Sequence, residues 1–521
     1  MSFLLKDTIH KSIADSLINE IRFGRANYYY YIGKVMPWSN VQQADAPQVT
    51  QAYESDTRNK IIAIKKITSA DAAYVVPRVD WTSNTIYDMF DGNYDSNYTS
   101  YSGAEKLSDT NFYVMTEDFN VYKCIDNNAN ATSTSKPTGT DFEVVTTADG
   151  YVWKYLYTLD LGLRNRFLTS DYMPVKRAVY DQFYDKGAVT AVTIDNAGTG
   201  YSNSNTSFTL TGDGANASLT PFVNNAGQLI DVVINNPGEG YTYLNIAVVG
   251  SGSNANVSAS FSSGDVTSPQ STVELSAVDG SIEAFRIHDG GNSYSHANIV
   301  VTGDGSGFEG SVSINSNAVS KITVSEAGRG YTFANVQISG DGANANVEAI
   351  FSPAGGHGKD AVKELFADTI MLYSTINNEK IHNVTVNNDY RQFGILKNPD
   401  QYANNKLFLG ITGSPTYLVT LDTTAGLQED SILALSDDST REFEVVEATS
   451  TQAVLTSVNN YTLVVGDALV DDNTSTTHTI TAVNEYPDIN KFSGDLLYID
   501  NRTKVSYGDE QLVTLRTIIR V

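Results

Sequence analysis

The sequence predicts a mainly β protein, in which a β-rich domain with a few helices is interrupted by a β-repeat array and by a further small β domain. Three observations lead to this prediction. A cassette of glycine, tyrosine and short apolar runs occurs four times between residues 187 and 352. Short apolar runs, separated by turns rich in Gly, Asn, Asp and Ser, fill most of the remaining chain. The one long helical pattern lies near the start, where Ile9, Ile13, Leu17 and Ile21 recur every four residues and predict a helix that ends near Gly24.

Each cassette consists of an apolar run, a glycine-rich turn that ends in tyrosine, a second apolar run and a Gly-x-Gly turn. The interval from the tyrosine to the later turn is 11, 9, 9 and 9 residues, so the cassettes keep their register. Each cassette supplies about three short strands, which are too few to bury a face alone, so we expect neighbouring cassettes to pair or stack. The four tyrosines are Tyr201, Tyr241, Tyr294 and Tyr331.

The order of these patterns predicts five segments. The array begins after a charged pair at 185–186 and ends at Pro353-Ala354-Gly355-Gly356, as an independently folded insertion would. Residues 406–485 read as a separate small barrel or sandwich, and two strand-like runs near the end are expected to rejoin an earlier sheet. The segments are 1–186 (first part of the main domain), 187–352 (repeat array), 353–405 (return segment), 406–485 (second insertion) and 486–521 (final strands).

Composition and charge narrow the function classes. The 521 residues carry a net charge of −26, with 60 acidic and 34 basic residues and no basic stripe, so nucleic-acid binding is disfavoured. No run approaches the ~18 apolar residues of a membrane helix, and the start lacks the apolar core of a signal peptide, so we expect a soluble protein made in a cytoplasm. Cys124 is the single cysteine, which excludes an internal disulfide. The 31 tyrosines favour surfaces that contact other proteins.

Two short segments resemble catalytic motifs only in part. His288 and His296 flank one tyrosine turn, but histidines in such turns are more often surface residues than metal ligands. Residues 356–360, Gly-His-Gly-Lys-Asp, resemble a phosphate-binding loop, yet they lack its first glycine and carry Asp360 where Ser or Thr would bind magnesium. We interpret them as a turn that leads into a short helix over 360–366.

The acidic turns of the cassettes present a second alternative. Asp213, Asp304 and Asp341 resemble the carboxylates of calcium-binding β-rolls, but the nonapeptide period of such rolls is missing and Ser251 takes the place of the aspartate in the second turn. Ordinary Asp-Gly hairpin turns explain them better. We therefore predict no catalytic, cofactor-binding or metal-binding residue, and we do not expect an enzyme.

An ordered set of short motifs lies outside the repeats. It includes the three tryptophans, Trp38, Trp81 and Trp153, which we interpret first as core anchors. The motifs are Tyr31-Ile32-Gly33, Pro37-Trp38-Ser39, Val76-Pro77-Arg78-Val79-Asp80-Trp81, Asp149-Gly150-Tyr151-Val152-Trp153-Lys154-Tyr155-Leu156, Tyr390-Arg391-Gln392-Phe393 with Asn398-Pro399, and Gly494-Asp495-Leu496-Leu497-Tyr498-Ile499-Asp500-Asn501-Arg502.

In this order the motifs resemble the gene-8-type baseplate wedge subunit of T-even-like, contractile-tailed bacteriophages. The match covers about residues 1–185 and patches of 365–400 and 490–521. The resemblance implies a non-enzymatic β-sandwich subunit of the virion, usually dimeric, that joins neighbouring wedge proteins in the tail baseplate and is assembled in the host cytoplasm. The best-known form of the family lacks a repeat array, so 187–352 and 406–485 are expected to be insertions into a discontinuous wedge domain.

A second hypothesis assigns the chain to a different class, a carbohydrate- or receptor-binding tail module carried by the repeats. Such a module would place the four cassette tyrosines in an exposed row. The competing interpretation is that each tyrosine packs over its own glycine turn.

Overall fold

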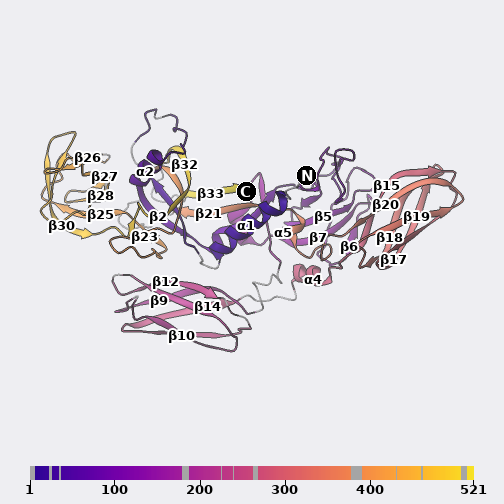
Figure 1. Cartoon of the computed structure of the whole chain (residues 1–521), viewed down its shortest axis with the longest axis horizontal. Coiled ribbons are helices and arrows are strands. Elements are labelled where there is room, and N and C mark those ends of the chain that lie inside the picture. The colour runs from indigo at the N-terminus through magenta and orange to yellow at the C-terminus, as the bar shows by residue number, and fades with distance from the viewer. Residues whose placement is uncertain are drawn as a thin grey trace, which may run out of the picture.

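The computed structural model describes residues 6–22, 26–34, 37–40, 42–178, 187–202, 204–224, 226–236, 238, 240–261, 268–376, 390–429, 431–458, 461–505 and 513–520. The chain is mainly β, as predicted. Its parts follow one another along an elongated body, from a barrel at one end to a repeat unit at the other, and a further repeat unit lies beside the body (Figure 1).

A five-stranded antiparallel sheet joins three distant parts of the chain. Its strand order is β24-β2-β1-β22-β32. The strands are β1 (Tyr28–Gly33), β2 (Ile61–Ile67), β22 (Tyr390–Lys397), β24 (Thr412–Gly413) and β32 (Asp495–Val505). The central strand β1 is buried along its whole length, because its four consecutive tyrosines pack on both faces of the sheet. The first, return and final segments therefore fold together.

A four-stranded sheet repeats this pattern with the order β33-β21-β3-β8. The strands are β3 (Ala72–Pro77), β8 (Tyr172–Val175), β21 (Thr369–Ile376) and β33 (Val513–Arg520). β33 pairs along its full length with β21, which confirms that the C-terminal run rejoins an earlier sheet. The hydroxyl of Tyr30 donates to the carbonyl of Leu372 over 3.1 Å, and both sheets contribute to one hydrophobic cluster.

Helix α1 (Lys6–Arg22) covers this cluster with only part of the apolar series that predicted the helix. Ala14, Ile18 and Ile21 are buried, whereas Ile9 and Ile13 are 39% and 49% exposed. A strict four-residue spacing advances about 40° around a helix at each step, because one residue turns it by about 100°. The series therefore leaves the buried face, which follows the 14, 18, 21 spacing instead.

A third sheet has the strand order β4-β5-β7-β6. Its strands contribute to the hydrophobic cluster that contains Trp153 and against which Trp81 packs. The strands are β4 (Tyr113–Met115), β5 (Asn120–Asp126), β6 (Val144–Thr146) and β7 (Val152–Thr158). The polar loop 127–140 is held to the rest of the fold at two points. Asn127 is buried and donates to the Tyr87 carbonyl over 2.9 Å, and buried Ser133 donates to Asp149 over 3.2 Å. These side-chain bonds hold polar loop residues inside the fold.

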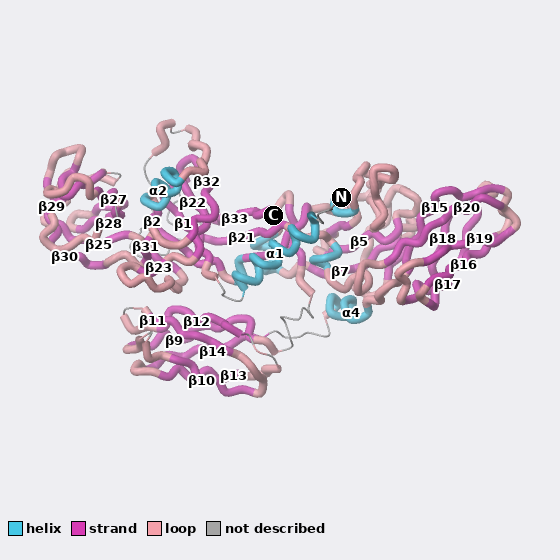
Figure 2. The backbone as a smooth tube through the Cα atoms, in the orientation of Figure 1, coloured by secondary structure: helices cyan, strands magenta, loops and turns pink. Residues whose placement is uncertain are grey.

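The four cassettes form two units of six strands, each from one cassette pair (Figure 2). Within a unit, the first strand of one cassette pairs with the third of the other, and the two middle strands pair with each other. The first unit contains β9 (Val189–Thr199), β10 (Ser207–Gly212), β11 (Ser218–Val223), β12 (Leu229–Asn236), β13 (Leu244–Val249) and β14 (Ser253–Phe261). The second contains β15 (Ile282–Asn292), β16 (Ala297–Gly303), β17 (Ser306–Asn315), β18 (Ala318–Arg329), β19 (Ala334–Gly340) and β20 (Ala343–Phe351).

The second insertion is a closed barrel with the order β25-β28-β27-β26-β29-β30. Of the two predicted alternatives, barrel and sandwich, the structure has the barrel. Its strands are β25 (Thr416–Leu421), β26 (Ile432–Leu435), β27 (Glu442–Ala448), β28 (Gln452–Ser457), β29 (Ala468–Asp471) and β30 (Thr477–Glu485). The short pair β23 (Asp400–Gln401) and β31 (Ile489–Asn490) lies at the two points where the chain enters and leaves it.

Four further helices complete the described part of the chain. α5 (Ala361–Glu364) lies within the predicted 360–366 segment, and the Asp360 side chain caps its start. α2 (Gln51–Asn59), α3 (Leu161–Phe167) and α4 (Pro269–Ser276) were not predicted, although each begins after a capping Thr50, Asp160 or Ser268. Among the described residues, the helices are all too short or too polar to cross a membrane.

Candidate functional site

The tyrosine turns of the repeats are buried, which contradicts the exposed row expected of a glycan-binding face. Tyr201, Tyr241, Tyr294 and Tyr331 are only 3–7% exposed. Each ring packs over a glycine of its own turn: a Cβ atom added to Gly198 would lie 2.7 Å from the ring of Tyr201. These tyrosines are therefore core residues of the repeat units.

Each tyrosine ring also packs against a glycine turn of the other cassette in its unit. The ring of Tyr201 covers Gly252, and the ring of Tyr241 covers Gly212, where any Cβ atom would clash. The backbone N–H of Tyr241 donates to the carbonyl of Gly187 over 3.1 Å, at the start of the other cassette. The second unit has the same reciprocal contacts, in which Tyr294 covers Gly342 and Tyr331 covers Gly305.

The acidic turns cap these tyrosine turns. Asp304 accepts hydrogen bonds from the backbone N–H and hydroxyl of Thr332, over 2.9 and 2.5 Å, and from the backbone N–H of Phe333 over 3.2 Å. The threonine hydroxyl, followed by its backbone N–H, lowers the pKa of Asp304 to about 2. Asp213 with Thr242, and Asp341 with Ser295, repeat the arrangement. Where Ser251 replaces the aspartate, its hydroxyl donates to the Gly200 carbonyl over 2.8 Å.

The two histidines that flank the third turn pair with different carboxylates. His288 Nε2 lies 2.9 Å from Glu348, and His296 Nδ1 lies 3.4 Å from Asp341. Within the described ranges, no group of three or more His, Cys, Asp or Glu side chains is arranged to hold a metal ion.

Residues 356–360 form a buried turn rather than an open phosphate cradle. The backbone N–H of Gly358 donates to the Glu364 carboxylate over 3.0 Å, and the same carboxylate pairs with Lys123, which is fully buried. His357 packs edge-on against Phe90, 5.0 Å between ring centroids, and burial lowers its pKa. The interpretation of this segment as a turn into a helix agrees with the structure.

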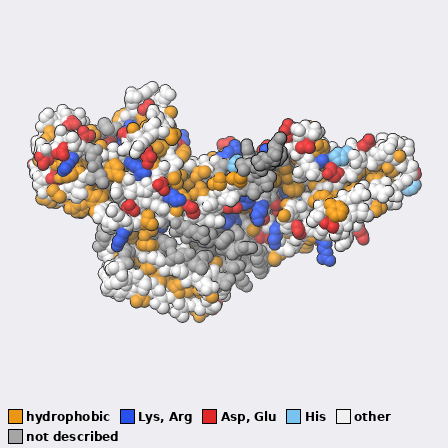
Figure 3. Space-filling model, viewed as in Figure 1, with side chains coloured by type: hydrophobic (Ala, Val, Ile, Leu, Met, Phe, Trp, Pro, Cys, Tyr) orange, Lys and Arg blue, Asp and Glu red, His pale blue; other side chains and the backbone are white. Residues whose placement is uncertain are grey.

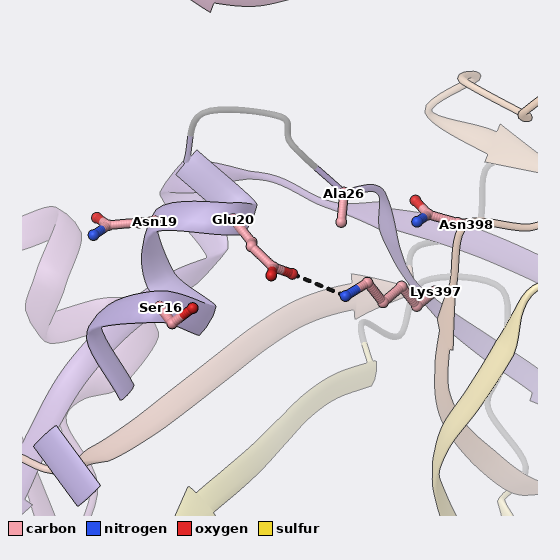
Figure 4. Close-up of a pocket in the computed structure, with 6 residues that line it drawn as sticks. All are labelled: Ser16, Asn19, Glu20, Ala26, Lys397 and Asn398. Carbon is pink, nitrogen blue, oxygen red and sulfur yellow. Dashed lines mark hydrogen bonds and ion pairs between the residues drawn. The ribbon is translucent and has the colours of Figure 1, made fainter. Parts of the chain in front are cut away.

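A pocket of about 350 Å³ opens between α1 and the end of β22 (Figure 4). Glu20 and Lys397 point toward each other across it, with 2.9 Å between Oε2 and Nζ. The Tyr28 hydroxyl also donates to Glu20, over 2.5 Å, and the hydrogen bond to Glu20 raises the pKa of Lys397. Both charges are thus paired within the protein, and the contact joins α1 to the five-stranded sheet.

A buried lysine links the barrel to the main domain. Lys491 is 3% exposed, and its Nζ donates to the Thr456 hydroxyl on β28, over 2.8 Å, and to the carbonyl of Asn59 at the end of α2. Burial lowers the pKa of Lys491 to about 7, although the nearby Glu444 carboxylate opposes this shift. The sequence held no signal for this site, because its partners lie 35 and 432 residues away.

The motif residues that flank the insertions meet at the five-stranded sheet. The Tyr31 hydroxyl donates to the carbonyl of Tyr498 over 3.4 Å, and the Trp38 indole N–H donates to the carbonyl of Arg502 over 2.7 Å. Gln392 donates to the Asn501 side chain over 2.8 Å. Segments up to 467 residues apart in the chain therefore form one cluster.

The tryptophans lie where core anchors are expected. Trp153 is fully buried and stacks on Tyr151, with 5.5 Å between ring centroids, and Trp38 is 7% exposed. Trp81 is partly buried against the same cluster as Trp153. Arg78 and Asp80 form a local ion pair, with 3.0 Å between Nε and Oδ1.

Comparison with known proteins adds no relative: no protein-family model matches the chain, and no curated protein matches it.

Proposed function

We propose that the chain is a structural subunit of the baseplate wedge of a contractile phage tail, where it joins neighbouring wedge proteins. The observation that carries the proposal is that motif residues from both sides of the insertions meet at the five-stranded sheet. Tyr31, Trp38, Gln392, Tyr498 and Arg502 belong to motifs that resemble those of the wedge family, and the bonds among them cross the two insertions. A chance set of short motifs would have no reason to lie side by side in the fold.

The placement of the insertions supports the same proposal. Both repeat units and the barrel are β bodies with their own hydrophobic residues, and in the sequence they stand between strands of the main domain. Insertion is tolerated where the host chain ends lie close together at a surface, so such bodies add contact surface to a host domain at little cost to it.

The alternative function, glycan or receptor binding by the repeats, depended on an exposed row of the four cassette tyrosines, but these tyrosines are buried. The aromatic side chains that the described repeats do expose are Tyr243 and Phe333, each two residues after a buried tyrosine and 57% and 61% exposed. Two such positions in separate units do not make a continuous stacking platform.

Cryo-electron microscopy of the purified particle that contains this chain tests the proposal. We expect its density at the baseplate, with the main domain in contact with neighbouring subunits. A chain that is located only in fibres or the capsid, or that is absent from the particle, contradicts the proposal. Loss of glycan-array binding on substitution of Tyr243 and Phe333 by alanine would instead favour the alternative.

A further inference from the structure

The two repeat units have the same strand pairing but different surroundings. The hydrophobic cluster of the first unit contains only residues between 189 and 261. In the second unit, Ala284 and Ile350 are buried in one cluster with Trp153 of β7 and Val273 of α4. The second unit is therefore docked on the N-terminal β domain, by which we mean the part of the main domain built on the sheet β4-β5-β7-β6, whereas the strands of each repeat unit pair only with one another.

Arg286 is the main polar contact of this docking. Its Nε lies 3.0 Å from Oδ2 of Asp91, and Nη2 contacts the same oxygen. Asp91 is fully buried and Arg286 is 7% exposed. The guanidinium also lies over the ring of Tyr98, 3.5 Å from its centroid. Since a buried carboxylate is strongly destabilising without its cation, the site on the main domain requires a positively charged side chain here.

A second basic residue binds at the other side of the contact. Lys321 Nζ donates to Asn128 Oδ1 over 3.1 Å and to the carbonyl of Gly150 over 3.2 Å. Burial raises the pKa of the Asp126 carboxylate, and the positive charge of Lys321 opposes this shift. The acceptors that the main domain offers to the second unit are thus carbonyl and carboxylate oxygens, which bind basic groups.

The first unit carries different residues at the same positions. Arg286 lies eight residues before its turn tyrosine and pairs across the strands with Glu348. Thr193 lies eight residues before the equivalent tyrosine and pairs with Ser258. Both Thr193 and Ser258 are exposed.

The other residues of the first unit that correspond to docking residues of the second unit differ from them in charge and polarity. Asp231 stands ten residues before the second tyrosine of the first unit, where the second unit has Lys321. Exposed Ser260 stands where the second unit buries Ile350. The first unit has no Lys, Arg or His at all, and its visible face is mostly uncharged (Figure 3).

We propose that Arg286 and Lys321 select the second repeat unit for the docking site on the N-terminal β domain, and that Thr193 and Asp231 exclude the first unit from it. Thr193 would leave Asp91 buried without a cation, and the first unit has an acidic residue, Asp231, at the sequence position of Lys321, where the carbonyl of Gly150 needs a donor. The partner that this site fits is a β-repeat unit with a basic pair at these two positions. The corresponding face of the first unit is left exposed.

Hydrogen exchange of the full chain tests the selection. In the double variant Arg286→Thr and Lys321→Asp, we expect exchange in peptides covering 87–98 and 149–153 to rise at least tenfold, with β16 and β19 unchanged. Arg329→Thr, an exposed basic residue of the same unit, is the matched control. If the double variant unfolds β16 and β19, the single variant Lys321→Asp is measured instead, and its exchange at the docking site decides the test. Unchanged exchange at the docking site in both variants overturns the proposal.

A graft tests the exclusion of the first unit. In the double-variant background, Thr193→Arg, Asp231→Lys and Ser258→Glu should restore protection of 87–98, either within one chain or between two chains. Size-exclusion chromatography with light scattering separates these two supporting outcomes. If protection is not restored at any chain concentration, the two basic residues do not determine which unit binds, and the proposal fails.

Discussion

Replacement of the buried Lys491 by methionine should change stability in a strongly pH-dependent way. The pKa of Lys491 is about 7 in the fold, because burial disfavours the ammonium, whereas an unfolded lysine has a pKa of about 10.4. Between these values the unfolded chain binds more protons than the folded chain, so stability rises with pH. The wild type should therefore gain about 2 kcal/mol relative to Lys491→Met between pH 7 and pH 9.

The measurement compares the two proteins at each pH, so that the titration of all other groups cancels. Native-state hydrogen exchange in the β27 and β28 peptides, corrected for intrinsic rates, reports the local free energy of opening. The ratio of wild-type to variant protection should rise roughly 30-fold between pH 7 and pH 9. The lost bonds to Thr456 and Asn59 add a constant offset that does not depend on pH.

Lys406→Met is the matched control, since Lys406 is exposed at the edge of the same insertion. Its protection ratio should stay level over the same pH range. A level ratio for Lys491→Met as well, or one that falls as pH rises, would refute the reasoning, because the folded lysine would then hold its proton as firmly as the unfolded one.

Three further changes test other parts of the chain. Gly305→Ala puts a Cβ atom against the ring of a turn tyrosine and should destabilise the second repeat unit by ~1–3 kcal/mol in thermal unfolding, whereas Gly92→Ala, with no atom within 4 Å of its Cβ, should be near neutral. The pKa of Asp213 is lowered to about 2 by the Thr242 hydroxyl, so its stabilising effect is complete above pH 3.8 and is lost as pH falls toward 2; Asp213→Asn should flatten this dependence in exchange of β13. Truncation after Asp488 removes β31, β32 and β33 and should raise exchange in β21 and β22, which pair with β33 and β32, while leaving β7 protected.

Local patterns in the sequence predicted the repeats well, because the relevant information is local. The tyrosine turn and the Gly-x-Gly turn recur at a fixed interval, and the runs between them alternate in polarity, so strand positions follow directly. The reciprocal closure of Tyr201 on Gly252 was not predictable in the same way. It depends on which cassette each strand selects as its partner, and every strand of one cassette has an equally suitable pattern.

The buried ionic contacts could not be predicted from the sequence, for a different reason. Arg286 and Asp91 are separated by 195 residues, and neither stands in a motif. An arginine on an alternating strand reads as a solvent-facing residue, since polar positions in a half-buried strand normally face water. Only the docking of the second unit turns that face inward, and docking is a property of two surfaces rather than of one segment.

The pairing of cassettes determines what can vary within the array. Every strand of a cassette takes its partner from the other cassette of the unit, and each tyrosine closes on the other cassette's glycine turn, so the folding unit is the pair and not the single repeat. The residues that make these contacts are alike in both units, because changing one would disrupt two cassettes at once. The outward positions carry no such constraint. Thr193 and Arg286 occupy the same place in the pairing and differ in size, charge and burial, which is why two units with one fold have different relations to the main domain.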